Sequence, residues 1–140
     1  MNGGRAVIAS LTLPGTERAA VQARAFVRDA LCSGHPSLDD VRTCVNEAFT
    51  NAVEHTGSGR GGKVGLLLLA AGTEIIAEVA DDGAGGAGPW LRDEPLAEDG
   101  RGMWMIDALA LGWGVRRDGT RTVVWMRFPG PPPSRVVVPA

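Results

Sequence analysis

Residues 37–56 repeat apolar side chains with the period of an amphipathic helix, and one face of that helix carries three polar groups. Glu47, Asn51 and His55 are spaced by four residues. On an α-helix each four-residue step turns by about 40° and rises about 6 Å, so the three side chains form a ladder along one side. A carboxylate can accept a proton, and an amide oxygen can bind a hard cation such as Mg²⁺. The ladder fits either an ordinary solvated face or one wall of a metal-assisted site.

Chain length and charge narrow the class of protein. The 140 residues are enough for one domain with its own apolar core. The 14 Lys and Arg residues against 16 Asp and Glu residues give a net charge of −2, which argues against direct nucleic-acid binding. No apolar signal region opens the chain, and the apolar run at residues 66–71 is too short to span a membrane. We expect a cytoplasmic protein without a membrane contact.

The two cysteines, Cys32 and Cys44, do not have the spacing of metal ligands. Both fall within apolar helical patterns, so we predict reduced thiols buried in the core of a cytoplasmic protein. A disulfide between them is the less favoured alternative.

The order of sequence patterns predicts a two-layer α/β sandwich. Ser37 and Asp40 resemble a capping box at the start of the second helix. The predicted strands are residues 6–13, 63–71, 74–80, 113–116 and 120–128, and the predicted helices are residues 16–31, 37–56 and 103–110. We expect a mixed, mainly antiparallel sheet of about five strands with three helices on one face, and the apolar side of residues 19–31 in the core.

Two segments lack helical or strand periodicity. Residues 83–100 hold glycine, proline and acidic residues, and a loop this long in a compact domain is usually a functional lid. Residues 129–140 begin with a run rich in proline that cannot continue a central strand, so we predict an extended or disordered tail. The expected organisation is one domain over residues 1–128 and a proline-rich tail over residues 129–140.

A short acidic and glycine-rich motif follows the strand predicted at residues 74–80. Asp81 precedes Gly83 and Gly85. A strand delivers a carboxylate to its carboxyl end, and the two glycines let a ligand ring approach bare backbone. A carboxylate there can accept a hydrogen bond from an exocyclic amine such as the N6 amino group of adenine. In isolation the motif is also compatible with an ordinary acidic turn.

A second glycine motif leads into the helix predicted at residues 103–110. Gly100, Arg101 and Gly102 come directly before Met103. Backbone N–H groups at a helix N-terminus, left open by glycine, bind anions, and phosphate is their natural ligand. Arg101 can contact the phosphate or remain solvated. Taken alone, a flexible loop before a core helix explains the same residues equally well.

The chain resembles the gyrase, Hsp90, histidine-kinase and MutL ATPase superfamily, whose ATP-binding motifs are called the N, G1 and G2 boxes. The helix ladder and the two glycine motifs follow one another in the order of these three boxes. The resemblance covers roughly residues 11–128. Within that group, residues 46–55 and 100–103 look most like the stand-alone serine kinases that act as anti-sigma factors in bacterial partner-switching systems. The resemblance implies the Bergerat ATP-binding fold, with ATP and Mg²⁺ as cofactors. The implied partners are an anti-anti-sigma protein of the STAS type, a sigma factor and, in a homodimer, a second copy.

The resemblance implies roles for matching positions only. Glu47 matches the general base that activates the acceptor hydroxyl, and Asn51 matches the amide that binds the Mg²⁺ bridging the phosphates. Asp81 matches the carboxylate that holds the adenine amino group, and Gly83 and Gly85 would let the base approach. The phosphates would be cradled beneath a lid of residues 84–99 by the second glycine motif and the helix start, that is by Gly100, Arg101, Gly102 and Met103.

Several positions depart from the family pattern or stay open. Gly86 stands where an apolar residue is usual, which should loosen the loop and weaken nucleotide affinity. Either Thr120 or Thr122 can present a hydroxyl towards phosphate, although structural strand threonines are the favoured interpretation of both. The role of His55 is open, with a structural hydrogen bond at the helix end favoured.

Two other functions fit parts of the sequence. A glycine pattern ending at Gly88, with Asp107 about twenty residues later, resembles a dinucleotide site. Prolines in the segment after Gly88 argue against the helix that such a site needs. The stronger alternative is an ATP-binding regulatory module without catalysis. Retention of both Glu47 and Asn51 favours catalysis, because a pure binding module needs no base beside the γ-phosphate.

Overall fold

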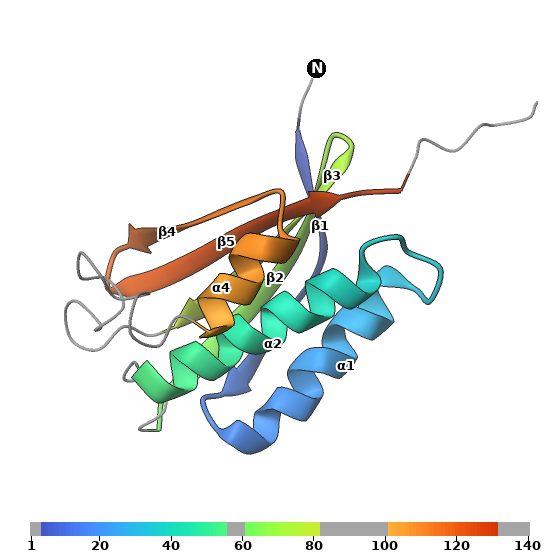
Figure 1. Ribbon diagram of the computed structural model, residues 1–140. Helices are drawn as coiled ribbons and strands as arrows, with labels where there is room; N and C mark the ends of the chain where they lie inside the picture. The colour runs from blue at the N-terminus through green and yellow to red at the C-terminus, as the bar shows by residue number, and fades with distance from the viewer. Residues whose placement is uncertain (1–3, 56–60, 82–100, 132–140) are drawn as a thin grey trace, which may run out of the picture.

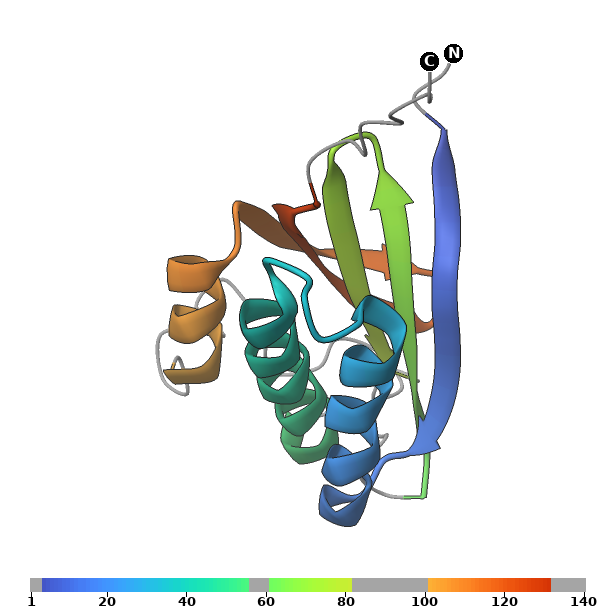
Figure 2. The same cartoon turned by 90° about the vertical axis from the view of Figure 1, so that its right-hand side faces the viewer.

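The protein is an α/β sandwich in which helices cover one face of a five-stranded sheet (Figures 1 and 2). The computed structural model describes residues 4–55, 61–81 and 101–131. Its elements are β1 (Arg5–Pro14), η1 (Glu17–Ala19), α1 (Ala20–Leu31), α2 (Leu38–His55), β2 (Lys63–Ala71), β3 (Glu74–Asp81), α4 (Arg101–Leu109), β4 (Gly112–Asp118) and β5 (Arg121–Pro129). The predicted fold class is confirmed. Within the described residues, no helix is long and apolar enough to cross a membrane.

The sheet has the strand order β1-β2-β3-β5-β4, and each of the four described pairings is antiparallel. The prediction of a mainly antiparallel sheet is therefore confirmed, without a parallel pair among the described strands. A dinucleotide-binding βαβ unit requires parallel neighbouring strands. The alternative based on Gly88 and Asp107 is accordingly wrong. Asp107 has a structural contact, since its Oδ1 accepts a 2.9 Å hydrogen bond from Nε1 of Trp113.

The core lies between the sheet and α2. Buried apolar residues recur along α2 at helical spacing: Val41, Cys44, Val45, Ala48, Phe49 and Ala52. They belong to one cluster with alternate residues of β3, namely Ile75, Ala77 and Val79, because alternate strand positions face the same side. Residues of α1 also join this cluster, as predicted for residues 19–31. The Ser37 hydroxyl, predicted to cap α2, donates a 2.6 Å hydrogen bond to the carbonyl of Pro129 and ties α2 to the end of β5.

The two cysteines differ in exposure, so the prediction of a buried thiol is confirmed for Cys44 and wrong for Cys32. Cys44 is fully buried, but Cys32 is exposed. Cys32 follows Leu31, the last residue of α1, and adopts a positive φ of 66° that turns the chain away from the helix. Burial raises the pKa of the Cys44 thiol to about 12, and the nearby charges of Asp40 and Glu47 add to this shift.

These environments predict selective thiol chemistry. At pH 8 the exposed Cys32 should react with a disulfide reagent such as DTNB, whereas Cys44 should react only after unfolding, because its pKa of about 12 keeps the thiol protonated. Release of thionitrobenzoate from native and denatured protein measures both reactions. The Cys32→Ser variant should show no fast native phase. A fast phase in that variant would contradict the burial of Cys44.

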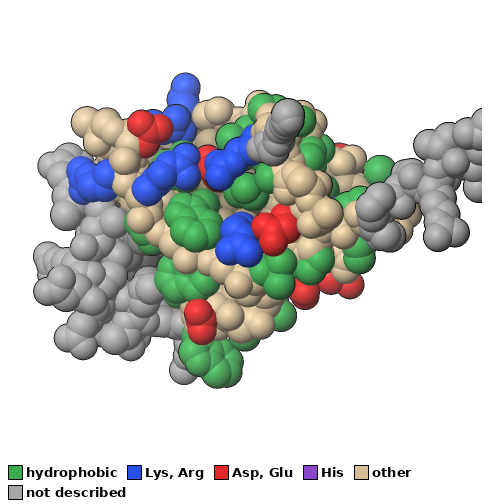
Figure 3. All heavy atoms as spheres, turned by 90° about the horizontal axis from the view of Figure 1, so that it is seen from above, with side chains coloured by type: hydrophobic (Ala, Val, Ile, Leu, Met, Phe, Trp, Pro, Cys, Tyr) green, Lys and Arg blue, Asp and Glu red, His purple; other side chains and the backbone are tan. Residues whose placement is uncertain are grey.

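The face of the sheet away from the helices carries paired arginine and glutamate side chains beside Trp125. Figure 3 looks down on β4 and β5 and shows Lys and Arg side chains among hydrophobic ones. Two arginines on this face hold carboxylates with paired hydrogen bonds: Arg116 to Glu78 at 3.1 and 3.1 Å, and Arg127 to Glu74 at 2.9 and 3.2 Å. Each bond raises the pKa of the arginine involved.

Gly114 on β4 leaves room for the ring of Trp125 to lie against the backbone. In a Gly114→Ala variant the new Cβ would lie 2.6 Å from Cζ2 of the rigid Trp125 ring, so we expect a loss of about 1–3 kcal/mol in unfolding free energy. Gly112→Ala is the matched control, because its Cβ would meet the flexible end of Arg127 at 2.7 Å and should cost less. Urea denaturation measures both variants. An equal loss of unfolding free energy in the two variants would contradict the rigid contact between position 114 and Trp125.

Candidate functional site

Glu47 and Asn51 lie on α2 away from the flank that faces α1. Asn46 marks the flank that faces α1, because its Oδ1 accepts a 2.8 Å hydrogen bond from Nη1 of Arg24 on α1. Glu47 is turned about 100° and Asn51 about 140° from Asn46 around the helix axis, in the same sense. Figure 2 shows α2 between α1 and α4, so this rotation carries Asn51 most of the way from the α1 side to the α4 side, and Glu47 about a quarter turn from α1. Both residues are half-buried.

Asp81 lies at the end of β3 on the helix-covered face of the sheet. It shares that face with the core residues Ile75, Ala77 and Val79, and it is only 1% exposed. A buried carboxylate needs a hydrogen-bonding or charged environment. The alternation of side chains along β3 thus places the Asp81 carboxylate between the sheet and the helices, at the end of a row of apolar core residues.

The strand register also settles the position of the two threonines. Thr122 lies directly opposite Asp81 in the pairing of β3 with β5 and is 1% exposed. Thr120 is an exposed turn residue. Thr120 and Thr122 are two residues apart and would share one face of a strand, so only the pairing of β3 with β5 separates them.

The helix α4 begins at Arg101, two residues earlier than predicted. Arg101 and Gly102 therefore belong to its first turn, where backbone N–H groups have no intrahelical acceptor. Met103 is buried in the core, so only its main chain can face a ligand.

The remaining predicted positions fall outside what the structure describes. Residues 82–100 include Gly83, Gly85 and Gly100 as well as the predicted lid at 84–99. The side chains of His55 and Arg101 are not described either, and only their places at the end of α2 and the start of α4 are known.

The described site residues gather at one end of the domain. Figure 1 shows the end of β3 and the start of α4 beside the C-terminal half of α2. The structure therefore brings together a half-buried carboxylate, an amide, a buried carboxylate with a facing threonine, and a helix N-terminus. These groups suit a ligand with a hydrogen-bonding ring at one end and anionic groups at the other.

The amide of Asn51 tests whether this site fits a magnesium nucleotide. Its Nδ2 is buried and has no hydrogen-bond partner within the described part of the chain. A buried amide without a hydrogen-bond partner raises the free energy of the folded protein. A ligand that forms this hydrogen bond would therefore bind more tightly. The amide can donate to a phosphate oxygen through Nδ2 or, after a half-turn, offer its oxygen to Mg²⁺. The site fits ATP with Mg²⁺.

Comparisons with known proteins agree with this geometry. A solved structure of the RsbU and RsbW domains of Rv1364c from Mycobacterium tuberculosis shares the fold, with a TM-score of 0.64 and 24% sequence identity. The match covers 94% of this chain and 34% of that one, so the chain spans about a third of the solved protein. The uncharacterized protein SCO4941 of Streptomyces coelicolor is 33% identical over 92 residues, which cover 64% of this chain and 85% of the relative.

The family model for the histidine kinase-like ATPase domain matches residues 13–128. That range runs from the end of β1 to the last core residue of β5 and includes every described residue of the candidate site. The chain therefore belongs to the histidine kinase-like ATPase domain family.

Proposed function

We propose that this protein is an ATP-dependent serine protein kinase and anti-sigma factor that phosphorylates a STAS-type anti-anti-sigma protein. Membership in a histidine kinase-like ATPase family implies ATP binding. The observation that supports the kinase proposal is that Glu47 and Asn51 are both half-buried and lie on α2 away from the flank that faces α1. The shared fold with a protein that contains an RsbW domain supports a place in a partner-switching system.

The adenine end of the site is assigned to Asp81. Its carboxylate would accept a hydrogen bond from the N6 amino group, and Thr122, directly opposite, would orient the carboxylate or a water beside it. Because both residues are 1% exposed, their hydrogen bonds to the base would be shielded from bulk water.

The phosphate end is assigned to α4 and Asn51. Backbone N–H groups of Arg101, Gly102 and Met103 would donate to phosphate oxygens, and the amide oxygen of Asn51 would hold Mg²⁺. Bound ATP supplies the γ-phosphoryl group. Glu47 would accept the proton of the acceptor serine as the serine oxygen attacks the γ-phosphorus in line and the bond from that phosphorus to the bridging oxygen breaks, releasing ADP. The N–H groups and Asn51 would stabilise the charge that develops on the phosphoryl oxygens.

Phosphotransfer to a partner tests the proposal directly. The purified protein is incubated with Mg²⁺-ATP and STAS-type proteins encoded in the same genome, and phosphoserine is sought by mass spectrometry. We expect one STAS protein to be modified, with no transfer when EDTA removes the metal. Tight ATP binding without transfer to any of them would favour the regulatory module without catalysis. We also propose that phosphorylation of the STAS protein releases it, so that the anti-sigma factor can then bind the sigma factor. A sigma factor that binds only while the STAS protein is unphosphorylated would contradict this order.

A further inference from the structure

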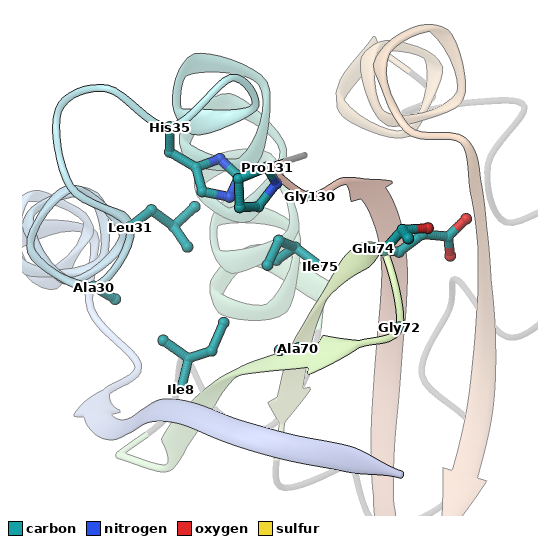
Figure 4. Close-up of a pocket in the computed structure, with 11 residues that line it drawn as sticks. Ile8, Ala30, Leu31, His35, Ala70, Gly72, Glu74, Ile75, Gly130 and Pro131 are labelled. Carbon is teal, nitrogen blue, oxygen red and sulfur yellow. The ribbon is translucent and has the colours of Figure 1, made fainter. Parts of the chain in front are cut away.

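An apolar pocket lies at the end of the domain remote from the candidate ATP site. It has a volume of about 280 Å³. Figure 4 shows Ile8, Leu31 and Ile75 converging on it from β1, α1 and β3. Glu74, at the rim, is already paired with Arg127. Because Glu74 and Asp81 stand at opposite ends of β3, the pocket and the proposed adenine site are separated by the length of that strand.

His35 brings a polar ring to the wall of the pocket. His35 Nδ1 accepts a 3.0 Å hydrogen bond from the backbone N–H of Ser37, which places the ring proton on Nε2. Nε2 is buried and has no hydrogen-bond partner among the residues described. Burial lowers the pKa of His35, so the ring is neutral at pH 7. The preferred occupant is therefore aliphatic and carries a carbonyl acceptor.

The chain itself supplies such a segment close by. Pro131 lines the pocket and is the last described residue, and Val136, Val137 and Val138 follow shortly after it. Five residues reach at most about 17 Å, whereas a sphere of the pocket's volume is about 8 Å across, so the valines can return to it. Each valine also brings one main-chain carbonyl.

We propose that the valine cluster of residues 136–138 docks in this pocket, with a main-chain carbonyl accepting the Nε2 proton of His35. The docked segment covers the apolar side chains of Ile8 and Ile75 and joins the start of β1 to the end of α1. Ile8, which is 37% exposed, becomes buried by this contact. The inference does not depend on the proposed kinase activity.

Disulfide trapping in the full chain tests the docking. In a Cys32→Ser background, Thr73→Cys at the pocket is combined with Val137→Cys, and the control combines Asp39→Cys with Val137→Cys. Asp39 is exposed and lies two residues from Ser37, which is bonded to Pro129, so both sites stand near the point where the tail begins. We expect the intramolecular disulfide to form at least about tenfold faster at position 73.

Two outcomes of the trapping experiment would overturn the docking. Equal rates at positions 73 and 39 would mean that tethering alone brings the thiols together. Disulfides formed only between chains would assign the pocket to a second copy. As a second measure, Val136→Asp with Val138→Asp should lower the Tm by about 2–6 °C and remove the preference for position 73, whereas Ser134→Asp should do neither. An unchanged Tm in the double variant would also contradict docking.

Discussion

Glu47→Ala is expected to slow phosphoryl transfer to the acceptor serine by about 100- to 10,000-fold while leaving the Kd for ATP nearly unchanged. In the proposed mechanism the Glu47 carboxylate accepts the serine proton during transfer, and the ATP contacts come from Asn51, Asp81 and the start of α4. Loss of the base therefore raises the barrier to the chemical step and spares ground-state binding. Single-turnover transfer from radiolabelled ATP measures the rate, and calorimetry measures the Kd.

The matched control for Glu47→Ala is Asp39→Ala. Asp39 is an exposed carboxylate on the first turn of the same helix, where its contact is a 3.0 Å ion pair with Arg42. A surface pair of this kind contributes little to stability, so the control should keep the native transfer rate. Transfer by Glu47→Ala at the native rate would show that another group takes the proton.

Asp81→Asn is expected to weaken ATP binding by roughly 10- to 100-fold, because a hydrogen bond to a charged group is worth about 1.5–3 kcal/mol. The substitution keeps the shape of the side chain but can turn an N–H group towards the adenine amino group, where two donors repel. The effect should be specific for the base. Wild-type protein should prefer ATP to inosine triphosphate, which lacks the amino group, and Asp81→Asn should lose this preference.

Competition between the two nucleotides separates this effect from misfolding. A misfolded variant would lose affinity for both nucleotides, whereas the predicted variant loses affinity for ATP and keeps its weaker affinity for inosine triphosphate. Asp118→Asn, at an exposed position before the β4–β5 turn, is the control and should bind as wild type does. An Asp81→Asn protein that still prefers ATP would remove Asp81 from the adenine site.

The sequence predicted the features whose physical cause is local. The ladder of Glu47 and Asn51 depends only on helical period, and the position of Asp81 depends only on where a strand ends, so both could be placed before the fold was known. Non-local features could not be placed in this way. The contact that draws Arg24 to Asn46, and thereby identifies the flank of α2 that faces α1, joins residues 22 positions apart.

Cys32 shows how a periodic pattern can mislead, and the two threonines of the last hairpin show how it can leave a choice open. Cys32 fits the apolar period of α1, but the helix ends at Leu31 and the backbone turns, so the side chain reaches solvent. Thr120 and Thr122 fit the same hairpin, and only the pairing of β3 with β5 sets Thr122 against Asp81. The pocket beside His35 was also beyond sequence reasoning, because residues of β1, α1, β2 and β3 and the segment after β5 build it together.

The central claim is that α2, the end of β3 and the start of α4 bind one metal nucleotide. Paramagnetic broadening by Mn²⁺-ATP in NMR spectra of the labelled protein tests it most directly, because the metal broadens only nearby resonances. The predicted result is selective broadening of the Asn51 side-chain amide and the backbone amides of residues 101–103, while Gly72 and Thr73 at the far end of the sheet stay sharp. Broadening at Gly72 and Thr73, with Asn51 unaffected, would contradict the assignment.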